Sequence, residues 1–118
     1  MAPHFRTLIA GAVAMTCMTG IVPAQAASFD CEKTDLAADE KAICENRALN
    51  DADVKMVTTF DILSTLLAMG ARGTMQDDQT AWLTKRQACN ADEACIKAAY
   101  DERQTQLNAA FGDIAKPL

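Results

Sequence analysis

The positions of five cysteines constrain this 118-residue chain more than any other feature. Cys17 lies in an apolar N-terminal stretch, and Cys31, Cys44, Cys89 and Cys95 follow it. If the stretch is a cleaved export signal, the odd number becomes even in an oxidising compartment, where disulfides form. We therefore expect an exported protein that is stabilised by two disulfides.

Residues 1–26 have the features of a signal peptide. Arg6 supplies a positive charge, residues 7–22 carry no charge, and Ala24-Gln25-Ala26 has the small-x-small form that signal peptidases accept. The alternative is a membrane anchor, but the apolar or neutral stretch of about 16 residues is shorter than the roughly 20 that span a bilayer. A second alternative is a lipoprotein acylated at Cys17, although Thr16 precedes it where a smaller residue is preferred.

Cleavage after Ala26 would leave residues 27–118 as one small domain in the periplasm or the medium. Loss of Arg6 leaves ten of the 11 Lys and Arg against 16 Asp and Glu, a net charge of −6. Such a charge disfavours nucleic acid and anionic membranes as partners, and it would attract a cationic protein. The alternative is that the charge serves solubility alone. We expect no stable membrane insertion after cleavage.

The residue composition predicts an all-α fold, because Ala, Leu, Glu, Lys, Gln and Met dominate and alternating patterns are absent. We expect a small bundle of about four helices in antiparallel hairpins, over residues 37–45, 47–69, 75–88 and 91–111. The Gly70–Gly73 segment is expected to end the second helix. Thr74 would then cap the third, with Asp77 and Asp78 in its first turn.

Two of these helices show the apolar spacing of packed faces. In the second, Leu49, Met56 and Leu63 recur every seven residues, and an interleaved set contains one acid, Asp53. In the fourth, the expected inward stripe comprises Ile96, Ala99, Tyr100, Arg103, Leu107 and Phe111.

Four cysteines allow three pairings, and the local one fits the helix positions best. Cys31–Cys44 would tie the N-terminal arm to the first helix, and Cys89–Cys95 would close the last hairpin. Loop-closure entropy gives them about 3 and about 2.4 kcal/mol of stabilisation. A redox pair is less favoured because no Cys-x-x-Cys occurs. A zinc site is less favoured because the only histidine, His4, lies in the signal.

Several sequence elements together resemble the LprI-like family of small exported bacterial domains, named for a lysozyme inhibitor and formerly a domain of unknown function. They are Phe29-Asp-Cys31, Glu40-Lys-Ala-Ile-Cys44, Leu49, Asp53, Gln79-x-x-Trp82-Leu-x-x-Arg86-x-x-Cys89, Cys95, Tyr100, Arg103 and Leu107. The resemblance implies an all-helical domain with two disulfides, and more loosely lysozyme inhibition. The chain departs from the family at Ala37, where a Ser or Thr cap is common, and at Phe60, where a Tyr is often found.

Gln79, Trp82, Arg86 and Cys89 are spaced to share one helix face. One interpretation is that this face packs on the second helix and that Arg86 forms an ion pair with Asp53, because a buried acid needs a partner. The other is a surface groove with Trp82 as the anchor for a partner.

The sequence gives no indication of an enzyme. It has no histidine beyond the signal, no Gly-rich phosphate loop and no free thiol, and its adjacent carboxylates point to different helix faces. We expect no cofactor and no metal site.

The function hypothesis is inhibition of a cationic lysozyme-type muramidase, and the alternative is an interaction or structural module with another partner. An inhibitor would bring a protruding acidic segment to the enzyme cleft, where two carboxyl groups catalyse the reaction. The expected contacts are Arg72 in the 70–74 connection, Asp77 and Asp78, with the 90–93 turn as a third candidate.

Overall fold

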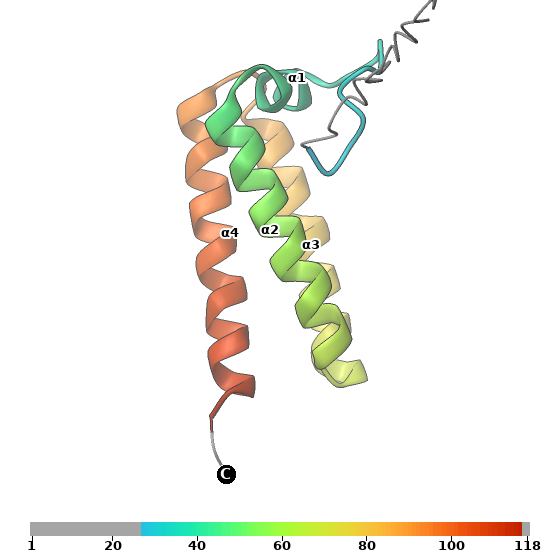
Figure 1. Ribbon diagram of the computed structural model, residues 1–118, viewed down its shortest axis with the longest axis vertical. Coiled ribbons are helices and arrows are strands. Elements are labelled where there is room, and N and C mark those ends of the chain that lie inside the picture. The colour runs from blue at the N-terminus through green and yellow to red at the C-terminus, as the bar shows by residue number, and fades with distance from the viewer. Residues whose placement is uncertain (1–26, 117–118) are drawn as a thin grey trace, which may run out of the picture.

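The computed structural model describes residues 27–116 and shows an all-helical domain within them. The helices are α1 (Ala38–Glu45), α2 (Arg47–Leu66), α3 (Met69–Ala88) and α4 (Glu93–Ile114). The three long helices run alternately down, up and down, and the short α1 lies across one end (Figure 1). The predicted class, a small bundle of four helices in antiparallel hairpins, is confirmed. The predicted signal peptide and its cleavage site lie outside the described residues.

Both local disulfides are formed. Cys31 and Cys44 have their Cα atoms 5.8 Å apart, and those of Cys89 and Cys95 are 5.6 Å apart. The first joins the N-terminal arm to α1, and the second closes the α3–α4 turn. Both lie at the end of the bundle that carries α1 (Figure 1). We call this the stapled end, and we call the opposite end, formed by the α2–α3 turn and the C-terminal part of α4, the open end.

The core follows the predicted stripes for most of their length. Leu49, Met56 and Leu63 of α2 are buried, as is Asp53. The α4 stripe is buried from Ile96 to Leu107, and α3 adds the following buried side chains: Met75, Trp82 and Arg86. Phe111 is the exception, since it is 51% exposed. The α4 stripe therefore continues beyond the part of the bundle that covers it.

The predicted connection at residues 70–74 is wrong, because these residues belong to α3. The chain turns earlier, at Leu67 and Ala68, where the backbone is extended, and α3 begins at Met69. Gly70 and Gly73 do not have positive φ, so neither acts as a left-handed helix end. A glycine inside a helix costs only about 1 kcal/mol, and packing of Leu67 and Met75 on the core outweighs that cost.

The early start of α3 changes the position of several predicted residues. Thr74 is not a cap, and its hydroxyl donates to the Gly70 carbonyl within the helix, at 3.3 Å. Asp77 and Asp78 lie in the third turn rather than the first, and both are exposed. They therefore do not interact with the positive end of the helix dipole.

The N-terminal ends of α1 and α4 differ in how they are capped. At α1 the N-cap is Ala37, whose N–H donates to Glu40 Oε2 at 2.9 Å, so only the reciprocal half of a capping box forms. At α4 the N-cap is Asp92, which accepts from the Cys95 N–H at 3.0 Å. Asn90 adopts a left-handed φ of 51° ahead of it, which asparagine tolerates better than most residues. The fourth helix thus begins two residues later than predicted.

Candidate functional site

A buried polar network fills the stapled end. Arg86 Nε donates to Asp39 Oδ2 at 2.9 Å, and its Nη1 donates to the Tyr100 hydroxyl at 3.2 Å. The Tyr100 hydroxyl donates to Asp53 Oδ1 at 2.8 Å. Asp53 also accepts from the Ser28 N–H at 2.6 Å. The network therefore joins all four helices and the N-terminal arm.

The predicted Asp53–Arg86 pair is part of this network but is not its shortest contact. Arg86 Nη1 lies 3.8 Å from Asp53 Oδ1, and Tyr100 bridges the two. The closer carboxylate belongs to Asp39, a residue that the sequence interpretation passed over. Only the three-dimensional packing of α1 against α3 brings Asp39 to Arg86.

The pKa shifts of Arg86 and Tyr100 keep both groups in the protonation states that the hydrogen bonds of the network require. Burial lowers the pKa of Arg86, but Tyr100 and Asp39 together outweigh that effect and raise it, so the guanidinium stays charged. Burial, and then the charge of Asp53, raise the pKa of Tyr100 well above its ordinary value. The hydroxyl therefore stays protonated and continues to donate to Asp53. Each of these side chains hydrogen-bonds to another one within the network.

Trp82 belongs to the core and is not the surface anchor that one interpretation of its helix face proposed. It is only 4% exposed, and its indole Nε1 donates to the Ala99 carbonyl at 2.7 Å. Its ring centroid lies 5.2 Å from that of Tyr100, and the Arg86 guanidinium lies 5.7 Å from its ring. The only tryptophan of the chain thus joins α3 to α4.

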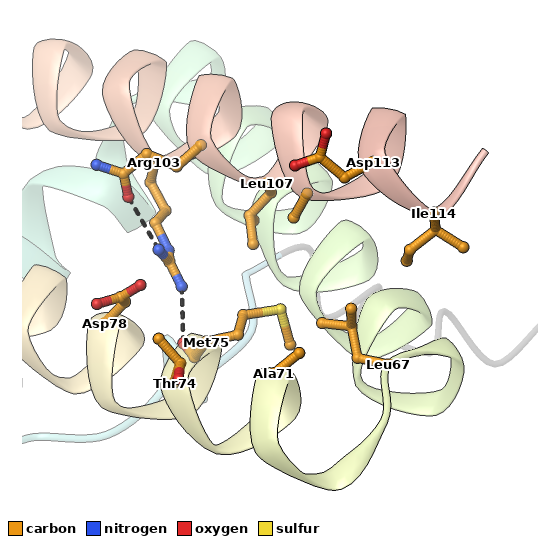
Figure 2. Close-up of a pocket in the computed structure, with 11 residues that line it drawn as sticks. Leu67, Ala71, Thr74, Met75, Asp78, Arg103, Leu107, Asp113 and Ile114 are labelled. Carbon is orange, nitrogen blue, oxygen red and sulfur yellow. Dashed lines mark hydrogen bonds between the residues drawn. The ribbon is translucent and has the colours of Figure 1, made fainter. Parts of the chain in front are cut away.

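One cavity lies at the open end, between α3 and α4. It has a volume of about 540 Å³. Figure 2 shows Arg103 and Asp78 toward one end of it and Leu67 and Ile114 toward the other. Its lining comes from the α2–α3 turn, α3 and α4: Leu67, Ala71, Thr74, Met75, Asp78, Arg103, Gln106, Leu107, Ala110, Asp113 and Ile114. We call this cavity the open-end pocket.

Arg103 forms a rigid wall of the open-end pocket although it is only 2% exposed. Its Nε donates to Gln79 Oε1 at 2.8 Å and its Nη1 to Gln106 Oε1 at 2.9 Å. Its Nη2 donates to the Met75 carbonyl at 3.0 Å. All three acceptors are neutral. Burial lowers the pKa of Arg103, and the nearby charge of Asp78 opposes that shift.

Exposed apolar side chains also occur at the open end, and one of them, Ile114, lines the pocket. Four large ones belong to the elements of the open end, and their exposed fractions range from 41% to 84%. We call them the apolar rim: Leu66, Met69, Phe111 and Ile114. Within residues 27–116, the two other large exposed apolar residues, Val54 and Ile62, belong to α2. The open end therefore combines a cavity with an uncovered apolar surface, which is typical of an interaction site.

The predicted partner-contact residues are not gathered at one place. Asp78 lines the open-end pocket, whereas its exposed neighbour Asp77 does not. Arg72 is half-buried, and its Nη2 donates to the Leu67 carbonyl at 3.0 Å, so it closes the α2–α3 turn instead of protruding. The sequence reasoning missed Asp113 and the apolar rim. The available signal was that the apolar stripe of the fourth helix extends to Phe111.

Between residues 27 and 116, no three His, Cys, Asp or Glu side chains are grouped so as to hold a metal ion. In that same range, no helix has both the length and the apolar character to cross a membrane. The scan against protein-family models found no matching model, and the searches of curated proteins and of solved structures found no match.

Proposed function

We propose that this chain is an exported, non-catalytic binding protein that inhibits a cationic lysozyme-type muramidase through its open end. The observation that carries the proposal is the open-end pocket with its apolar rim, on a domain of net charge −6. The resemblance to the LprI-like family suggests the muramidase as the partner. The two disulfides suit a protein that works in the periplasm or the medium.

The two ends of the bundle have different roles in this proposal. The stapled end holds the disulfides and the buried network, so its polar groups are used for stability. The open end presents the apolar rim, whose most exposed member is Met69 at 84%. Apolar side chains of this kind form the centre of protein interfaces, while surrounding charges raise the association rate. An acidic domain would thus be steered to a basic enzyme and held there by apolar contact.

A muramidase inhibition assay tests the proposal. The protein, purified after export with both disulfides formed, is titrated into c-, g- and i-type muramidases at physiological salt. We expect inhibition at micromolar protein, and a loss of it in Met69→Ser and Phe111→Ser. Val54→Ser is the matched control, because Val54 is an exposed apolar residue of α2 that lies outside the open end.

Three results would contradict the proposal. Inhibition of none of the three muramidase classes would exclude the partner and favour the alternative, a module with a different partner. Equal loss in Val54→Ser would show that the open end is not the contact surface. Inhibition that disappears at moderate salt would indicate unspecific charge attraction. Salt screens exposed charges, with a Debye length of about 8 Å at 0.15 M, but it does not screen the apolar contact that the proposal requires.

A further inference from the structure

We infer that the open-end pocket binds an aliphatic side chain that ends in a cation, a lysine or arginine of the partner protein. The inference rests on the proposed function, since it names the chemistry by which the same surface holds that partner. It is carried by the arrangement of apolar and charged groups around the pocket. The apolar surface disfavours short polar ligands, and the hydrogen-bonded Arg103 disfavours carboxylates.

The interior surface of the pocket is suited to an aliphatic stem. Leu107 and Met75 are buried along it, and Leu67 and Ile114 continue this apolar surface toward the end opposite Arg103 (Figure 2). Long basic side chains bury their methylene groups on such surfaces while the charged head stays in contact with water or an acid. A short polar ligand would leave this apolar surface exposed. The stem of the ligand is therefore assigned to this surface.

Arg103 does not make the pocket a carboxylate site. Each of its three nitrogens already donates a hydrogen bond to Gln79, Gln106 or the Met75 carbonyl. An incoming anion would have to displace these acceptors or bind at a poorer angle. Asp78, which lines the same end of the pocket, would repel it (Figure 2). A fatty acid is therefore disfavoured although a buried cation is present.

The carboxylates of the pocket are the groups that remain open to a ligand. Within residues 27–116, the Asp78 carboxylate has no ion-pair partner within 4.0 Å. Asp113 pairs with Lys116 at 2.7 Å, but both side chains are more than 70% exposed. A pair that exposed is weak, so a cation delivered by a docked partner can replace Lys116. The charged residues of the lining, Asp78, Asp113 and Arg103, give the pocket two negative charges and one positive charge, and this excess of negative charge favours a cationic head group.

A second copy of this chain is the other obvious occupant of an apolar rim. In such a dimer each copy would carry a net charge of −6. The open-end pocket would meet another pocket with the same two carboxylates. Like charges at a forming interface oppose association. The charge therefore favours a basic partner over self-association.

Three eight-carbon probes test the inference without any muramidase. The exported, disulfide-bonded protein is labelled with ¹⁵N and titrated with n-octylammonium, octanoate or 1-octanol, and amide shifts are followed. We expect saturable shifts at Ala71, Met75 and Leu107 with octylammonium, and at least tenfold weaker binding of octanoate. Asp78→Asn and Asp113→Asn should each weaken octylammonium about two- to fivefold, which is the range of exposed ion pairs. Asp77→Asn is the matched control and should change nothing.

Each other result would overturn the inference. Octanoate binding as tightly as octylammonium would assign an anion to Arg103. Equal binding of all three probes would mean that charge has no part in recognition, and binding of none would mean that the pocket takes no linear aliphatic chain. The proposed function fails separately: octylammonium binding without muramidase inhibition would leave the pocket chemistry intact and exclude the enzyme as the partner.

Discussion

Separating Arg86 from Asp39 should be among the most destabilising single changes in this protein. Arg86→Met leaves Asp39 and Asp53 buried without their cation, and both carboxylates are at most 1% exposed. Removing one partner of a buried ion pair costs about 3–5 kcal/mol. A domain of this size has about 5–13 kcal/mol of stability in total. We expect Arg86→Met to lose about a quarter or more of it.

A double-mutant cycle measures the contact itself. Arg86→Met and Asp39→Asn are made singly and together, and the free energy of unfolding is measured by guanidinium denaturation with circular dichroism at 222 nm. The 2.9 Å contact predicts a coupling of about 1–3 kcal/mol. The Arg86–Asp53 cycle should give a smaller coupling, because those atoms are 3.8 Å apart and share Tyr100. If Arg86→Met does not fold, Arg86→Gln, which also removes the charge but keeps a hydrogen-bond donor, replaces it in both cycles.

The control cycle uses Lys97 and Asp101, an ion pair four residues apart on α4. Their nitrogen and oxygen lie 2.6 Å apart, but the side chains are 64% and 65% exposed. Exposed pairs of this kind couple by about 0.3–0.5 kcal/mol. A coupling for Arg86 and Asp39 no larger than this control would refute the reasoning, because burial would then have added nothing to the interaction.

Three further predictions concern other parts of the fold. Because the folded-state pKa of Tyr100 is raised, the stability that this residue contributes is complete below pH 10 and is lost as the pH rises above that value. The chain has a single tyrosine, so absorbance at 295 nm reports its ionisation. We expect this tyrosinate signal to appear only as the helical circular-dichroism signal is lost. Gly70→Ala and Gly73→Ala should each stabilise the protein by about 0.5–1 kcal/mol in denaturant titrations, since both glycines are helical and nothing lies within 4 Å of an added Cβ. A loss of stability in these variants would instead indicate that residues 70–73 form the loop that the sequence suggested. Replacing both cysteines of the Cys31–Cys44 disulfide by Ser should cost about 3 kcal/mol, and an unchanged denaturation midpoint would contradict that figure.

The sequence was sufficient for the fold wherever local patterns and packing agree. The heptad Leu49, Met56 and Leu63 identified the buried face of α2, and cysteine spacing identified both disulfides. It failed at residues 70–74, where two glycines indicated a connection. Tertiary packing overrode that local preference, because helix propensity differs by only about 1 kcal/mol per residue.

The candidate site was less accessible to sequence reasoning. Arg103 and Asp78 were both noticed, but nothing in their spacing shows that they line one cavity with Asp113. One interpretation of the helix face with Gln79 and Arg86 made Trp82 a surface anchor, yet Trp82 is buried and its indole N–H donates to the Ala99 carbonyl of α4. Pockets arise where long helices stop covering one another. That geometry depends on where α3 begins, which is the boundary that the sequence placed six residues too late.

The central claim is that the open end is the surface that binds a cationic muramidase. The most direct test is to add a muramidase that the protein inhibits to the ¹⁵N-labelled, disulfide-bonded protein and to follow the amide signals of both ends. We predict that signals from residues 66–75 and 107–114 shift or broaden, while those around the Cys89–Cys95 disulfide do not. Changes confined to the stapled end, or spread evenly over the bundle, would contradict the claim.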